Sequence, residues 1–101
     1  MKLSEILKET DIIERHGNED IEIKNIKYNS KDIKKGDIFV AIEGVVFDGH
    51  NYIKDAIKNG ACAIIHEKNG FHSDVVDIKV NDSRKAHAQI SDRFLTPRQK
   101  I

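Results

Sequence analysis

The segment from Gly44 to Gly49 has the spacing with which phosphate-binding loops begin: a glycine, four residues and a second glycine. Such a loop binds a triphosphate only when lysine and then serine or threonine follow. The lysine neutralises the β- and γ-phosphates, and the hydroxyl holds Mg²⁺. Here His50 and Asn51 follow. The segment is therefore not an ATP site.

The same loop remains a candidate for binding another ligand. It joins the end of a predicted strand to the start of a predicted helix, where free backbone N–H groups and the helix dipole favour anions. Asp48 is also placed to cap that helix, which would satisfy some of the same donors. Local chemistry leaves both interpretations open, a ligand-binding loop or a plain connection.

Ser30 lies at the end of the earlier strand predicted at 26–28, and the loop follows the strand predicted at 38–42, so both segments follow carboxyl ends of predicted neighbouring strands. That edge is where open α/β sheets bind ligands. Tyr28 and Phe47 can supply planar surfaces on which a base stacks. The alternatives are that Ser30 bonds only its own turn and that both aromatic rings pack in the core.

The five histidines and the lone Cys62 do not form a metal-binding pattern. No two histidines have the i, i+4 spacing of a helical metal site, and no second cysteine joins Cys62. His66 and His72 flank a turn and can meet, but two ligands do not make a zinc site. No nucleophile–base arrangement is readable. We therefore expect no metal site and no catalytic residue in this chain.

Several elements are predicted to position these residues. Leu3, Ile6 and Leu7 have helical spacing after a possible Ser4 cap. In the short strands predicted at 21–23 and 26–28, the inward-facing positions are odd-numbered in the first and even-numbered in the second. One alternating strand cannot run through both, so we expect a break at residues 24 and 25.

The middle of the chain predicts a strand, a helix and a second strand. Ile38–Ile42 is a continuous apolar run, typical of a central strand covered on both faces. An amphipathic helix at 53–59 ends at Gly60, and Ala61–Ile65 is the next buried strand, with Cys62 as a small core residue. This order predicts a right-handed crossover between parallel strands.

The last third predicts a strand at Val75–Val80 and a helix capped by Asp82 or Ser83. Pro97 ends that helix. The apolar face of the helix is formed by Ala86, Ile90 and Phe94. The fold class is α/β, a small layered domain with a mixed β-sheet flanked by helices.

Composition limits the class of protein. The 101 residues make one domain or a piece of a larger protein. Seventeen basic residues balance seventeen acidic ones, which argues against nucleic-acid and membrane-surface binding. The N-terminal segment has no secretory signal, no apolar run reaches membrane length, and a single cysteine fits a reducing compartment. We expect a cytoplasmic protein.

Several motifs together resemble the N-terminal domain of the Mur ligases, most closely the MurE type. They are YNSK at 28–31, GDIFVA at 36–41, Gly44, DGH at 48–50, Gly60-Ala61 and VNDSRKA at 80–86. MurE-type enzymes are UDP-N-acetylmuramoyl-dipeptide ligases that add the third amino acid of the peptidoglycan stem. The resemblance covers essentially the whole chain.

In that family the N-terminal domain holds the UDP part of UDP-N-acetylmuramoyl-L-alanyl-D-glutamate. The resemblance implies substrate contacts at Tyr28, Ser30, Val45, Val46 and Phe47. The three apolar residues would make these contacts through backbone groups or packing. The usual aspartate and arginine on either side of the serine are replaced by Asn29 and Lys31, and lysine lacks the planar fork of arginine.

The resemblance also implies that residues 1–97 form the UDP-binding domain and that 98–101 begin a linker to an ATP-binding central domain. ATP and Mg²⁺ would serve the whole enzyme but not this segment, which would bind substrate without turnover. Its partners would be the central and C-terminal domains of the parent chain. Two alternatives remain: a MurF-type ligase domain, disfavoured by Asp82-Ser83-Arg84, and a stand-alone, non-catalytic module that binds a uridine nucleotide or a protein.

Overall fold

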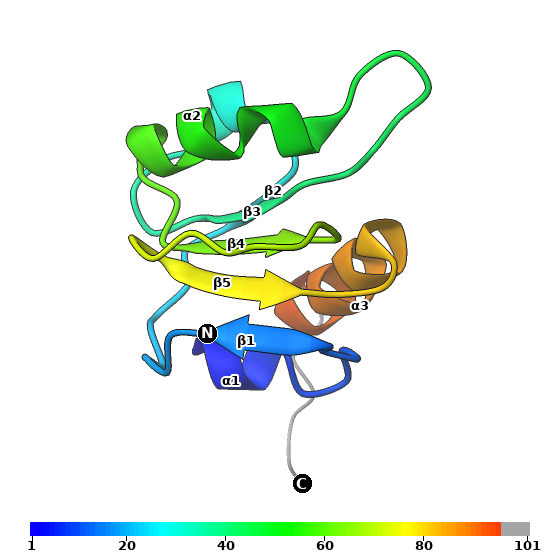
Figure 1. Ribbon diagram of the computed structural model, residues 1–101. Coiled ribbons are helices and arrows are strands. Elements are labelled where there is room, and N and C mark those ends of the chain that lie inside the picture. Colours follow the sequence, from blue (N-terminus) through cyan, green and yellow to red (C-terminus); the bar gives the residue numbers. More distant parts are fainter. Residues whose placement is uncertain (96–101) are drawn as a thin grey trace, which may run out of the picture.

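The structure, a computed structural model, describes residues 1–95 (Figure 1). The predicted helix stop at Pro97 and the predicted linker at 98–101 lie outside the described residues. In chain order the elements are α1 (Leu3–Ile6), β1 (Glu14–His16), β2 (Ile26–Lys27), the 3₁₀ helix η1 (Ser30–Asp32), β3 (Ile38–Val40), the 3₁₀ helix η2 (Gly49–Tyr52), α2 (Ile53–Asn59), β4 (Ala63–His66), β5 (Val76–Lys79) and α3 (Ser83–Leu95).

The five strands form one mixed sheet in the order β1-β5-β4-β3-β2. Strands β2, β3, β4 and β5 are parallel to one another, and β1 pairs antiparallel with β5. Helix α2 lies on one side of the sheet, and α1 and α3 lie on the other (Figure 1). The predicted α/β layered fold with a mixed sheet is confirmed.

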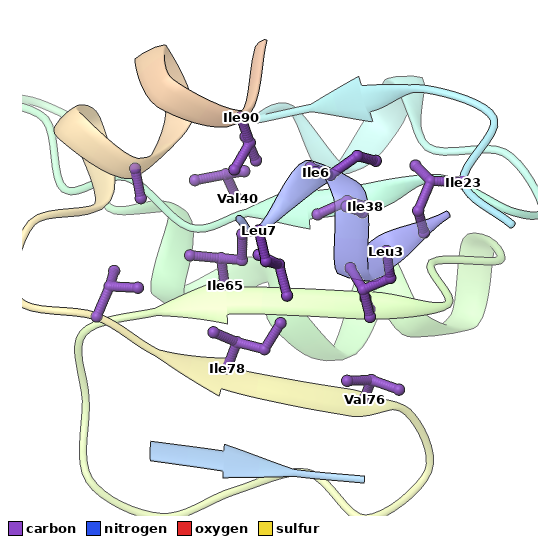
Figure 2. Close-up of a cluster of buried hydrophobic side chains, with 13 residues drawn as sticks. Leu3, Ile6, Leu7, Ile23, Ile38, Val40, Ile65, Val76, Ile78 and Ile90 are labelled. Atoms are coloured by element: carbon purple, nitrogen blue, oxygen red, sulfur yellow. The ribbon is translucent and has the colours of Figure 1, made fainter. Parts of the chain in front are cut away.

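Strand β3 lies between β2 and β4, and the side chains of residues 38–41 enter two separate cores. Ile38 and Val40 belong to the cluster beneath α1 and α3, which Figure 2 shows, while Phe39 and Ala41 belong to the cluster beneath α2. All four residues are fully buried. The continuous apolar run is explained by this double coverage, because alternate side chains point to opposite faces.

The predicted break at residues 24 and 25 is present, but the predicted strand at 21–23 is wrong, because Glu22 forms only an isolated antiparallel bridge with Lys2. The backbone N–H of Lys24 donates to the carbonyl of Gly36 over 2.9 Å, and that of Ile38 donates to Asn25 over 2.9 Å. Only Ile26–Lys27 then pairs with β3 as a strand. Helix α2 ends at Gly60 with φ of 119°, the left-handed conformation that was predicted.

Two sequence-based predictions are wrong or incomplete. Ser4 does not cap α1, because Lys2 occupies the cap position and the Ser4 hydroxyl donates instead to Asp20 over 2.9 Å. Strand β1 was not predicted. Its residues Glu14–His16 are polar and lie at the sheet edge, so they have no apolar alternation to reveal them.

Helix α3 begins as the sequence predicted. The carboxylate of Asp82 accepts a hydrogen bond from the backbone N–H of Lys85 over 3.0 Å. Ala86 and Ile90 are buried against the core, and Phe94 packs at its margin. Helix α3 therefore starts at the carboxyl-terminal end of β5, beside the ends of the other parallel strands.

Candidate ligand-binding site

A pocket of about 650 Å³ lies at the carboxyl-terminal edge of the parallel strands. Its walls come from the segments that follow β2 and β3 and from the first turns of α3 (Figure 1). The lining residues are Tyr28, Asn29, Ile42, Gly44, Val45, Val46, Phe47, Arg84 and His87. The volume falls in the range of small-molecule sites.

The pocket brings together four of the five residues predicted to bind substrate: Tyr28, Val45, Val46 and Phe47. Val45 and Val46 are fully exposed at the tip of the loop, at 104% and 97% of their free area. Ser30 does not line the pocket and is 4% exposed. A ligand in the pocket would thus contact the tyrosine and the loop rather than Ser30.

The aromatic rings of the pocket are not core residues, so that alternative is wrong for both. Tyr28 is 59% exposed and Phe47 is 48% exposed. The Tyr28 ring meets His87 edge-on, with centroids 5.5 Å apart, and Phe47 stacks on Tyr52 at 4.6 Å. Each ring is held by an aromatic neighbour while part of its surface stays open, which suits stacking on a planar ligand.

The loop between β3 and η2 is closed by short backbone hydrogen bonds. Gly44 N–H donates to the carbonyl of Phe47 over 2.7 Å, and Gly49 N–H donates to Ile42 over 2.9 Å. A Cβ on Gly49 would lie 2.8 Å from the Ile42 nitrogen, so this close approach needs glycine. Residues 45–47 are thereby held as a compact turn that projects beyond the sheet (Figure 1).

Asp48 caps the following turn, as predicted. Its Oδ1 accepts from the backbone N–H of His50 over 3.0 Å and lies 2.7 Å from His50 Nδ1. The backbone hydrogen bond from His50 holds the pKa of the Asp48 carboxyl below its usual value, although partial burial opposes the shift. This cap occupies the backbone N–H of His50 at the start of η2, so that donor is not free for a ligand anion.

Ser30 sits in a turn made by its neighbours. The Asn29 side chain accepts from the backbone N–H of Lys31 over 3.0 Å, and Asn59 on α2 donates to the Ser30 carbonyl over 2.9 Å. Ser30 is thus packed between the turn and α2. Its predicted contact with substrate stays a prediction.

Arg84 and His87 belong to the pocket and were not predicted as site residues. Arg84 Nη2 donates to the carbonyl oxygen of Glu43 over 3.2 Å, which joins α3 to the loop. Partial burial lowers the pKa of His87, which favours its neutral form. They could have been predicted from their position in the chain alone: both come after β5, at the sheet edge where the other candidate residues lie.

A larger hollow of about 1010 Å³ lies at the opposite, amino-terminal edge of the strands. It is bordered by the turns before β3, β4 and β5, and includes Gly36, Cys62 and Phe71. None of the five predicted site residues lines it. Because ligands of open α/β sheets bind at the carboxyl edge, we assign the candidate site to the smaller pocket despite its size.

His66 and His72 do meet, through a shared carboxylate. Asp77 Oδ1 lies 2.5 Å from His66 Nε2, and Oδ2 lies 3.1 Å from His72 Nδ1. His66 Nδ1 accepts from the backbone N–H of Lys68 over 3.2 Å, so its Nε2 carries the proton given to Asp77. These bonds join β4 to β5 and the turn between them, with both Asp77 and His66 buried.

Within residues 1–95 no group of three histidine, cysteine, aspartate or glutamate side chains is arranged to hold a metal ion. The same described part of the chain contains no helix long and apolar enough to cross a membrane. His50, which stands where a triphosphate-binding loop carries its lysine, has its ring Nδ1 2.7 Å from Asp48 Oδ1.

The chain matches the family model described as "Mur ligase family, catalytic domain" over residues 22–95. A UDP-N-acetylmuramoyl-L-alanyl-D-glutamate--2,6-diaminopimelate ligase of Clostridioides difficile (strain 630) is 45% identical over 102 residues, covering 100% of this chain and 21% of that protein. The ligase of the same description from Clostridium tetani (strain Massachusetts / E88) is 43% identical, with 100% and 22% covered. The chain thus spans about a fifth of the length of these relatives.

Solved structures agree with these matches. The structure titled "Crystal structure II of MurF from Acinetobacter baumannii" superposes with a TM-score of 0.75 at 28% identity, covering 86% of this chain and 19% of that one. MurF ligase from Thermotoga maritima in complex with ADP gives 0.64 at 37% identity, with 77% and 18% covered.

Proposed function

Because the chain belongs to the Mur ligase family, we propose that it binds the UDP moiety of UDP-N-acetylmuramoyl-L-alanyl-D-glutamate as the N-terminal domain of a MurE-type ligase. The observation that carries this proposal is the pocket at the carboxyl edge, where Tyr28 and the loop 45–47 meet. Curated relatives at 43–45% identity are ligases named for this substrate.

The lining of the pocket supports the proposal, because it offers groups suited to a pyrimidine nucleotide. Tyr28 and Phe47 offer open ring faces for the base. Backbone groups of the exposed turn at 45–47 are accessible for hydrogen bonds to its edge, so apolar side chains there do not prevent recognition. Asn29 adds an amide to the same wall.

The segment itself would anchor substrate and perform no chemistry. In the parent enzyme ATP and Mg²⁺ would bind to a central domain, and the amino acid would be added at the junction with the C-terminal domain. The whole ligase would form an amide bond in peptidoglycan synthesis, in the cytoplasm. This chain's contribution would be to hold the nucleotide end so that the peptide carboxylate reaches that junction.

A MurF-type domain is the second candidate, favoured by the solved MurF structures that superpose on 77–86% of the chain. Identity to these structures is 28–37%, lower than the 43–45% to the two diaminopimelate ligases described above. Competition between the UDP-linked dipeptide and tripeptide for the complete enzyme separates the two types. A MurE-type enzyme uses the dipeptide, and a MurF-type enzyme uses the tripeptide.

The proposal is tested by calorimetric titration of the 101-residue chain with the UDP-linked dipeptide. Tyr28→Ala should weaken binding by roughly 5- to 100-fold, since base–aromatic stacking contributes about 1–3 kcal/mol. Phe71→Ala, an exposed ring at the opposite edge, is the matched control and should leave affinity unchanged. Equal affinity of wild type and Tyr28→Ala would contradict the assignment, and no binding would reject UDP anchoring by this chain.

A further inference from the structure

We propose that Arg84 binds the diphosphate of the nucleotide through charge-assisted hydrogen bonds. The inference rests on the proposed function, and it places the diphosphate end of the nucleotide at the wall of the pocket formed by α3. Arg84 was not a predicted substrate contact. It is placed by the fold, because α3 starts where β5 ends and its first turn closes the pocket.

Charge is the first reason. Arg84 is the one lining residue with an ionised side chain, since the others are apolar, aromatic, amide or glycine, apart from His87. Partial burial lowers the pKa of His87, so this imidazole does not supply a competing cation at neutral pH. A diphosphate held in this pocket therefore has a single guanidinium to neutralise it.

The unused donors of Arg84 are the second reason. A guanidinium carries five N–H groups in a planar fork, and the bond from Nη2 to the Glu43 carbonyl uses one of them. Among residues 1–95 no carboxylate forms an ion pair with Arg84. The remaining donors suit the bidentate geometry of phosphate oxygens.

The neighbouring acids are already engaged elsewhere. Glu43 faces Lys68 Nζ at 3.9 Å. Glu67 Oε2 accepts from the backbone N–H of Ser83 over 2.7 Å, and Asp82 Oδ1 accepts from that of Lys85. These bonds fix the first turn of α3 and leave the Arg84 side chain for a ligand.

The hydrogen bond to the Glu43 carbonyl also fixes the position of the guanidinium. Glu43 directly precedes Gly44, so Arg84 is tied to the base of the turn that presents residues 45–47. A nucleotide with its base at Tyr28 and Phe47 would then place its phosphates toward α3. The α3 dipole, positive at this end, acts in the same direction.

The test compares affinities for uridine, UMP and UDP in wild type, Arg84→Gln, Arg84→Lys and the control Lys85→Gln. Lys85 is the next residue of α3, is exposed and does not line the pocket, so Lys85→Gln makes the same charge change outside the site. Wild type should prefer UDP to uridine by about 10- to 100-fold, the range for hydrogen bonds to charged groups.

In Arg84→Gln this preference should fall to about threefold or less, with uridine affinity within a factor of two of wild type. Arg84→Lys should keep part of the preference because it keeps the charge without the fork. Lys85→Gln should behave as wild type. A preference unchanged in Arg84→Gln would overturn the inference while UDP binding stands. Failure of wild type to bind any of the three ligands would reject both this inference and the proposed function.

Discussion

The Nε2 atom of His50 accepts a hydrogen bond from the backbone N–H of Glu67 over 3.0 Å. Since Nε2 accepts, the proton of the neutral ring lies on Nδ1 and is donated to Asp48 over 2.7 Å. Glu67 in turn accepts the backbone N–H of Ser83 at the start of α3. One buried imidazole therefore connects the loop at 44–49 to the residue that follows β4 and, through the Glu67 side chain, to the start of α3.

Replacing His50 with alanine should lower the unfolding free energy by about 1–3 kcal/mol, because the Glu67 N–H is left without its acceptor. The same change should weaken binding of the UDP-linked dipeptide, since the loop loses its connection to β4. Urea unfolding and calorimetric titration measure the two effects. Full affinity in a destabilised His50→Ala chain would show that the connection supports the fold but not the site.

Asp48→Asn should remove the pH dependence of the stability that the Asp48 cap contributes. The backbone N–H of His50 lowers the Asp48 pKa in the folded chain, so the charged carboxylate stabilises the fold above its ordinary pKa of about 4. That stabilisation is lost as the pH falls through the lowered pKa. The stability difference between wild type and Asp48→Asn should therefore be largest near neutral pH and shrink below about pH 4. A difference that is constant between pH 7 and 3 would contradict the assigned cause.

His87→Gln should change the response to mild acid. Burial lowers the His87 pKa in the folded chain, so the unfolded chain takes up the proton first as the pH falls through about 6.5. Wild type should consequently lose stability relative to His87→Gln between about pH 7.5 and 5.5. Thermal unfolding across this range measures the effect, and parallel curves for the two chains would show that His87 is not desolvated.

Gly60→Ala and Gly70→Ala form a matched pair. Both glycines have positive φ, 119° and 87°, so alanine is strained at either position. A Cβ on Gly60 would also lie 2.7 Å from the backbone of Lys35, whereas Gly70 has nothing within 4 Å. We expect losses of about 1 kcal/mol for Gly70→Ala and about 2–5 kcal/mol for Gly60→Ala in urea unfolding. Equal losses would show that the turn before β3 yields to the added methyl group.

Ser83→Ala should be neutral or stabilising. The Ser83 hydroxyl is buried and has no hydrogen-bond partner within residues 1–95, while its backbone N–H keeps the bond to Glu67. Removing a buried hydroxyl without a partner removes a desolvation penalty. Urea unfolding should place the variant within about 0.5 kcal/mol of wild type or above it. A loss greater than about 1 kcal/mol would show that the hydroxyl has a partner in solution.

The sequence predicted those elements in which the spacing of apolar residues follows directly from which faces are buried. Strand β3 is apolar throughout because both faces are covered, and α2 repeats its apolar residues up to Gly60. Strand β1 was missed because its pairing with β5 depends on backbone groups at an edge, with side chains that show no apolar alternation. Ser4 was misassigned because its partner, Asp20, is distant in sequence.

The site was predicted in part for similar reasons. Tyr28 and the loop 45–47 follow strand ends, and parallel pairing of β2 with β3 places them together. Ser30 lies outside the pocket and is buried, because η1 begins there and its carbonyl accepts a hydrogen bond from Asn59 on α2. Arg84 and His87 required knowledge of where α3 lies, which depends on the order of β3, β4 and β5 in the sheet.

The most direct measurement is a ¹H–¹⁵N titration of the 101-residue chain with UDP-N-acetylmuramoyl-L-alanyl-D-glutamate, run beside Ser30→Ala. Our proposal predicts shifts concentrated at Tyr28, the turn 45–47 and the start of α3, and weaker shifts in Ser30→Ala. Shifts centred on Cys62 and Phe71 at the amino-terminal edge, or none at millimolar ligand, would contradict it.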